Sequence, residues 1–151
     1  SETDDTYKSE DFQQSEEHSY NPQDDSYSRN IASEDLLNKL FHSKNAFIKL
    51  MALKILCFRN NPELIDTLLI ASNSDKKSVR KYAQKEIKSR LNKDSLKIIE
   101  KIWLEGDLSK KFQILTVAEE LNDIRFKILF RLHKQKLPAI LRKRIFNFLD
   151  Q

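Results

Sequence analysis

Turn-forming and redox-active residues are scarce in this 151-residue chain, which has one glycine, three prolines and one cysteine. So few glycines and prolines leave few of the tight turns that sheets require, and an all-α fold is expected. A single glycine also excludes a Walker-type phosphate loop and a dinucleotide-binding fingerprint, since each needs several glycines. No apolar run reaches about 18 residues, so no membrane-spanning helix is expected.

The lone cysteine and the three histidines offer no recognisable catalytic or metal-binding pattern. Cys57 has no second thiol for a zinc site, and His18, His42 and His133 lack the HExxH spacing. Cys57 lies in the apolar run Ile55–Phe58 and is expected to be a small core residue. We therefore predict no catalytic residues, no metal ligands and no cofactor, and an active site assembled from scattered residues stays as a third, enzymatic alternative.

A pattern returns about every 31 residues: an aliphatic residue, a polar or basic one, a small one three positions on, and an apolar one four beyond that. The copies are Ile48-Lys49-Ala52-Leu56, Val79-Arg80-Ala83-Ile87 and Leu141-Arg142-Ile145-Leu149. Periods of this length indicate stacked units, none of which buries its apolar face alone. A weaker third copy is expected at Phe112-Gln113, leading to Thr116 and Glu120.

The second copy is the best formed. The segment 61–69 has a proline near its start and Leu68-Leu69 at its end, and it precedes Asp75, Val79, Arg80, Ala83 and Ile87. This arrangement resembles a HEAT-like, armadillo-type repeat, a helical pair whose second helix often opens with Asp, then Val-Arg, Ala and Leu. The resemblance implies an α-solenoid of about four hairpins over residues 33–151. It also implies a structural bond between Arg80 and Asp75, as an alternative to a binding role for Arg80.

Apolar residues at three- to four-residue spacing and capping residues predict where the helices lie. Side-chain acceptors at Ser33, Asn61, Asp94 and Asp123 are expected to cap helix starts. The expected helices are 34–42, 45–59, 62–72, 76–91, 95–104, 108–121, 124–135 and 138–149.

Composition changes near residue 30. Residues 1–30 contain nine acidic and two basic residues, a net charge of −7, and no Ala, Val, Ile, Leu or Met. Such a segment buries too little apolar surface to offset the entropy of ordering, so residues 1–32 are predicted to form a disordered acidic tail or linker. The tail is expected to be a spacer or to fold back onto the basic domain. Residues beyond 30 carry 25 basic and 14 acidic residues, a net charge of +11 that the overall +4 conceals.

A basic helical surface attracts acidic protein segments, nucleic acid or anionic lipid, although charge runs are also ordinary solvated faces. We predict a non-catalytic scaffold or adaptor that binds an acidic or amphipathic protein segment, with sequence-independent nucleic-acid binding as the alternative. The last helix is rich in apolar residues and is expected to be a surface for self-association or for a partner, or to be covered by further repeats of a longer chain. The predicted partner-binding residues are Lys77, Arg80, Lys81, Lys110, Lys111, Arg142, Phe146 and Phe148.

The sequence leaves the cellular location open. The chain starts at Ser1 rather than Met, and a polar segment ahead of a folded domain is expected downstream of a membrane anchor. Removal of Met or trimming explains the same start. Two expectations therefore stand: a cytoplasmic module, or a module tethered to a membrane through an anchor outside this sequence.

Overall fold

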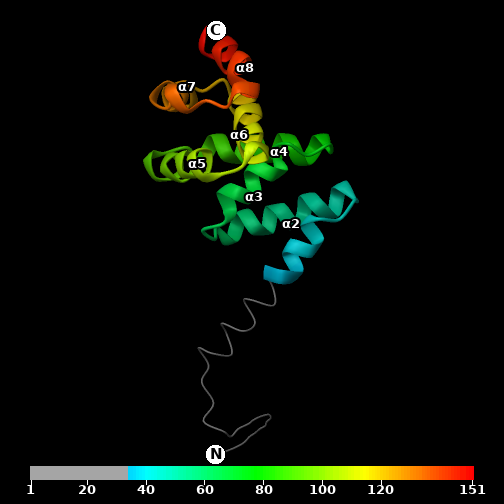
Figure 1. The fold of residues 1–151 in the computed structure, drawn as a ribbon. Coiled ribbons are helices and arrows are strands. Elements are labelled where there is room, and N and C mark those ends of the chain that lie inside the picture. Colours follow the sequence, from blue (N-terminus) through cyan, green and yellow to red (C-terminus); the bar gives the residue numbers. More distant parts are fainter. Residues whose placement is uncertain (1–33) are drawn as a thin grey trace, which may run out of the picture. The chain divides into compact units, whose positions relative to one another are not determined.

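The computed structural model describes residues 34–151, and within this range the chain forms helices joined by turns, with no strand (Figure 1). The predicted all-α fold is confirmed. The predicted tail and the Ser33 cap lie outside the described residues. The chain divides into two compact units, Ser1–Lys39 and Leu40–Gln151. The described residues of the first unit, 34–39, belong to a helix that ends at residue 41, and Lys39 pairs with Asp35 at 3.5 Å.

The second unit continues with seven α-helices and one short 3₁₀ helix. These are α2 (Ala46–Arg59), α3 (Leu64–Ala71), α4 (Lys77–Arg90), α5 (Lys93–Glu105), α6 (Leu108–Leu121), α7 (Ile124–Leu132), η1 (Lys134–Lys136) and α8 (Ala139–Leu149). Each overlaps the corresponding expected range, with ends that differ by up to three residues.

The differences at helix ends have local causes. Helix α5 starts two residues earlier than expected because Asn92, not Asp94, is its N-cap and forms a capping box with Ser95. Helix α3 starts at Leu64, since the residues after Asn61 form a turn in which the Leu64 amide donates to the Asn61 carbonyl at 2.9 Å. Asp123 caps α7 as predicted, by accepting from the Arg125 amide.

Helices of the second unit pack in alternation along the chain. Helix α4 contacts α2, α3 and α6, and α6 in turn contacts α3, α5 and α8, while α7 packs on α8 (Figure 1). Alternate helices α2, α4, α6 and α8 therefore each contact the next of the set, and we call them the second helices. The largest buried side chains include Trp103, Phe126, Phe130 and Phe148. Full burial of such side chains contributes roughly 1.5–3 kcal/mol each.

Arginine side chains connect one part of the unit to the next. Near the end of α4, Arg90 donates to the Cys57 carbonyl at 3.2 Å and to the Asn60 side chain at 3.1 Å, so the ends of α2 and α4 are joined. Arg90 is held in place by Glu86, one turn earlier, at 3.0 Å. Because a guanidinium offers several donors in a fixed plane, one side chain makes all three bonds.

Arg125 makes the equivalent connection at the start of α7. It donates to the Leu91 carbonyl at 3.0 Å and forms a two-point bond with Asp123, at 2.9 and 2.7 Å. The hydrogen bonds from Arg125 lower the pKa of Asp123 from its ordinary value to about 2. The ionised form of this N-cap is therefore stabilised by the fold.

The single glycine, Gly106, lies in the turn between α5 and α6. A Cβ atom at this position would lie 2.5 Å from the Ile102 carbonyl oxygen and 2.8 Å from Lys110 Cβ. Its φ of −74° is open to any residue, so the close approach of backbone and side chain is what requires glycine here.

Candidate functional site

Each of the four second helices carries one basic residue of the 31-residue pattern, and all four residues make the same kind of hydrogen bond. Lys49, Arg80, Lys111 and Arg142 are spaced 31 residues apart. Each donates to a backbone carbonyl that lies before its own helix: Phe41 at 2.7 Å, Ser74 at 2.9 Å, Gly106 at 2.6 Å and Leu137 at 3.3 Å, respectively. We call these four bonds the carbonyl ladder. They hold the turn that precedes each of these helices, so these cations have a structural role.

The carbonyl ladder corrects the register expected for the third copy. A period of 31 from Arg80 leads to Lys111, not to Gln113. Accordingly Ile114 and Ala118 are fully buried, whereas Phe112 is 45 % exposed and Glu120 is exposed. The small and large residues of the second copy, Ala83 and Ile87, have exchanged places in the third, which hides the repeat in the sequence.

Arg80 bonds to the Ser74 carbonyl, whereas the resemblance had implied Asp75, whose side chain is exposed. Arg80 therefore makes a structural bond, but it bonds to a backbone carbonyl and not to the Asp75 side chain.

We call the basic members of the predicted partner-binding residues the ridge, and its remaining lysines differ in their surroundings. Lys110 on α6 pairs with Asp66 on α3 at 2.7 Å and links two helices 44 residues apart in sequence. Lys81 approaches Glu120 at 3.9 Å with both side chains about half exposed, a pair that contributes little. Lys77 is exposed at the start of α4. The ridge is therefore not one continuous surface of unpaired cations.

Phe148 was predicted to contact a partner, and the structure places it in the core instead. It is fully buried and meets the Phe130 ring edge-on, with the ring centroids 5.9 Å apart. Phe130 in turn packs on Trp103, at 4.9 Å between centroids. Leu141 and Ile145 are buried on the same side of α8. Three apolar residues of the last helix thus belong to the core, whereas Ile140 is exposed, and the prediction that Phe148 contacts a partner is wrong.

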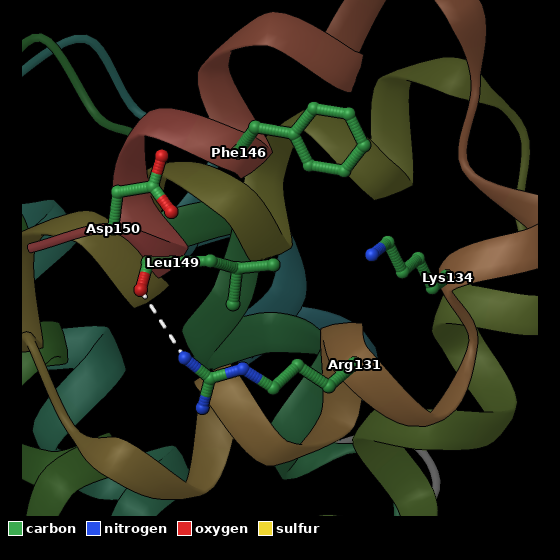
Figure 2. A pocket seen from close by; sticks show the side chains of 5 residues that line it. All are labelled: Arg131, Lys134, Phe146, Leu149 and Asp150. Atoms are coloured by element: carbon green, nitrogen blue, oxygen red, sulfur yellow. Dashed lines mark hydrogen bonds between the residues drawn. The ribbon is translucent and has the colours of Figure 1, made fainter.

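Phe146, by contrast, is 37 % exposed and lines a hollow between the end of α7 and α8 (Figure 2). The hollow measures about 530 Å³ and is lined by Arg131, Lys134, Phe146, Leu149 and Asp150. Arg131 is held by the Leu149 carbonyl at 3.2 Å, and the Lys134 ammonium lies 5.9 Å from the centre of the Phe146 ring. Figure 2 shows these cations on the side of the hollow opposite Phe146 and Asp150.

A second hollow, of about 470 Å³, shares Phe146. It is lined by Ala139, Arg142, Lys143, Phe146 and Asn147. The structure thus brings together two predicted site residues, Arg142 and Phe146. Around one half-exposed aromatic ring it gathers four cations and one carboxylate, which we call the Phe146 site: Arg131, Lys134, Arg142, Lys143 and Asp150.

Arg131 and Lys134 were missed because they belong to a different helix and turn from α8. The one available signal is Leu137-Pro138, which marks a turn that brings the end of α7 back toward α8.

The chemistry of the Phe146 site suits anionic groups beside an apolar or aromatic one. Cations of this kind bind carboxylates and phosphates, and arginine does so with two parallel hydrogen bonds. The face of Phe146 offers a surface on which an aromatic or aliphatic side chain stacks.

Two other reactive side chains of the described range, Cys57 and His133, lie away from the Phe146 site. Burial raises the pKa of the Cys57 thiol, which keeps it protonated and poorly nucleophilic. His133 pairs with Glu100 at 2.6 Å and joins the turn after α7 to α5. Between residues 34 and 151 there is no cluster of three or more His, Cys, Asp or Glu side chains placed to hold a metal ion.

None of the helices described over this range is both long and apolar enough to cross a bilayer. Comparison of the chain with protein-family models, with curated proteins and with solved structures finds no match.

Proposed function

We propose that this chain is a non-catalytic protein-interaction module, built as an α-solenoid of four HEAT-like hairpins behind a disordered acidic tail. The 31-residue carbonyl ladder and the contacts between successive second helices support the solenoid. Each unit packs on its neighbours, as repeat proteins do. Modules of this architecture commonly serve as scaffolds that present an extended binding surface.

The ligand that we propose is an acidic segment of a partner protein with an aromatic or large aliphatic side chain. The observation that carries this proposal is the Phe146 site, where a half-exposed ring lies between two hollows lined by four cations. Acidic groups of the segment pair with Arg131 and Lys134, and its apolar side chain stacks on Phe146. The binding surface that we propose therefore lies at the end of α7 and on α8, rather than along the ridge.

A synthetic peptide of Glu residues around one Tyr, labelled with a dye, tests the proposal by fluorescence anisotropy. The double substitution Arg131→Glu and Lys134→Glu is expected to weaken binding at least about tenfold, which corresponds to 1.4 kcal/mol. The matched control is Lys97→Glu with Lys101→Glu on α5, where both lysines are exposed. It changes the net charge equally and is expected to alter binding less than about threefold, because only long-range attraction is affected.

Equal losses in the two double variants would contradict a defined site and indicate diffuse attraction to the basic surface. A duplex oligonucleotide measured alongside tests the alternative of nucleic-acid binding. Tighter binding of the duplex, with a steep fall in affinity as salt rises and no effect of the Arg131 and Lys134 changes, would favour that alternative.

A further inference from the structure

Helix α2 carries an exposed apolar stripe along one side. Its members are Phe47, Met51, Ile55 and Phe58, which are 71, 42, 42 and 91 % exposed. Their spacing of four, four and three residues places them on one face of the helix. A contiguous exposed apolar stripe indicates a surface that is covered.

The repeat register identifies what covers this face. The position equivalent to Met51 one period of 31 later is Tyr82 on α4, and three periods later it is Arg144 on α8. Tyr82 lies against the preceding second helix, α2, where its ring is 5.5 Å from the Lys54 ammonium. Arg144 lies against α6, where it donates to Glu119 at 3.3 Å. The Met51 side of α2 is therefore the side on which a preceding second helix packs, and residues 34–151 contain none for it.

The opposite face is open on α8. On α2, Lys54 and Cys57 contact Tyr82 of α4, and Leu53 and Cys57 are buried. Three periods later these positions are Phe146, which is 37 % exposed, and Asp150, which is exposed. Asn147 takes the place of Lys54, the residue that contacts Tyr82.

A hollow lies at this open face of α8. It is the hollow of about 470 Å³ beside Phe146 and Asn147. The α8 groove, as we call it, thus occupies the position at which α2 receives the next helix of its own chain.

We infer that the α8 groove of one molecule receives the Met51 side of α2 from a second copy of this chain, so that molecules stack head to tail. The contact continues the packing of α2 on α4 and of α6 on α8 across the boundary between two molecules. It goes beyond the proposed function, since no acidic ligand takes part. Both contacts use Phe146, so a stacked molecule and an acidic ligand compete for that ring. Such a contact joins two different surfaces and leaves one of each free, so it extends into open-ended chains.

Charge gives the contact a recognisable salt dependence. Helix α2 contains three basic and no acidic residues, and α8 likewise contains three basic and no acidic residues between Ala139 and Leu149. Salt screens the repulsion between two basic ends, so head-to-tail stacking strengthens as salt rises. Binding of an acidic ligand at the Phe146 site changes in the opposite direction.

Sedimentation velocity on the full chain tests the inference, with one substitution at each end. Met51→Arg places a charge on the stripe, and Asn147→Arg places charge and bulk in the α8 groove. Both side chains are exposed, so folding is expected to be unaffected and is checked by circular dichroism. The control is Ile98→Arg on α5, at a position 41 % exposed and away from both ends of the stack.

The unmodified chain and the Ile98→Arg control are expected to sediment faster as concentration and salt rise. Each end variant alone is expected to remain a monomer, because every contact needs one intact stripe and one intact groove. An equimolar mixture of the two variants is expected to form a dimer and nothing larger, since the groove of the Met51→Arg chain meets the stripe of the Asn147→Arg chain.

Three results would overturn the inference. One is a monomeric unmodified chain at all concentrations. Another is association of the Asn147→Arg chain with itself, which would indicate a two-fold contact between α2 stripes. The third is association that weakens with salt, which would indicate pairing of acidic and basic segments.

Discussion

The carbonyl ladder predicts that its lysine and arginine side chains stabilise the fold to different extents. The perturbation is Lys111→Met, which keeps an unbranched side chain of similar length and removes only the charge and its donors. Lys111 Nζ lies 2.6 Å from the Gly106 carbonyl oxygen in a partly buried position. A hydrogen bond to a charged group contributes about 1.5–3 kcal/mol, and partial exposure lowers this to roughly 1–2 kcal/mol.

The weakest member of the ladder provides a comparison within the same protein. Arg142 reaches the Leu137 carbonyl at 3.3 Å, and Arg142 is exposed. We therefore expect Arg142→Met to cost less than about 1 kcal/mol. Lys77→Met, at an exposed position, is the control and is expected to change stability by less than about 0.5 kcal/mol.

Urea unfolding followed by circular dichroism measures these differences. The expected order of destabilisation is Lys111→Met, then Arg142→Met, then Lys77→Met. In a thermal scan, 1–2 kcal/mol corresponds to a fall in Tm of roughly 3–8 °C for a unit of this size. If Lys111→Met and Lys77→Met unfold at the same urea concentration, the ladder contributes nothing to stability and our assignment of these cations to a structural role is wrong.

Two further predictions concern the turns at the ends of α5 and α6. Asp123→Asn removes a carboxylate whose folded pKa of about 2 lies below its ordinary value near 3.9, so its contribution is full above about pH 4 and is lost as pH falls through about 2. Because solvent screens this turn, we expect Asp123→Asn to lower the free energy of unfolding in urea by about 1–2 kcal/mol at pH 7. If the same difference from the unmodified chain is measured at pH 2, the link between this pKa and stability is wrong. Gly106→Ala places a Cβ 2.5 Å from the Ile102 carbonyl oxygen and is expected to lower the free energy of unfolding by about 1–3 kcal/mol. Ser109→Ala, at an exposed position, is the control and is expected to cause no change. Equal stability of the two variants would show that the turn adjusts freely.

Sequence periodicity predicted where the helices lie because apolar spacing and capping side chains act over a few residues. It failed at the third copy, where Ile114 and Ala118 exchange the sizes seen at Ala83 and Ile87. Burial depends on which face of a helix meets its neighbour, and a size pattern is only an indirect sign of that face. The basic residue, Lys111, keeps the period of 31 and was the better marker.

The candidate site was predicted in part. Phe146 and Phe148 are two residues apart on an apolar helix, so composition gave no reason to separate them, yet one lines a hollow and the other fills the core. The packing of α8 on its neighbouring helices, α6 and α7, decides between them. The same packing brings Arg131 and Lys134 to Phe146, and no local pattern along the chain contains that information.

The bonds that hold this unit together span very different lengths of chain. Each member of the carbonyl ladder closes a loop of five to eight residues, whereas Arg90, Arg125 and Lys110 connect positions 33, 34 and 44 residues apart. Loops of the first kind close in well under a microsecond, and chains dominated by such local contacts fold fast. We expect the turns held by the carbonyl ladder to form early, and the arginine and lysine connections between distant helices to form afterwards, when neighbouring helices pack on one another.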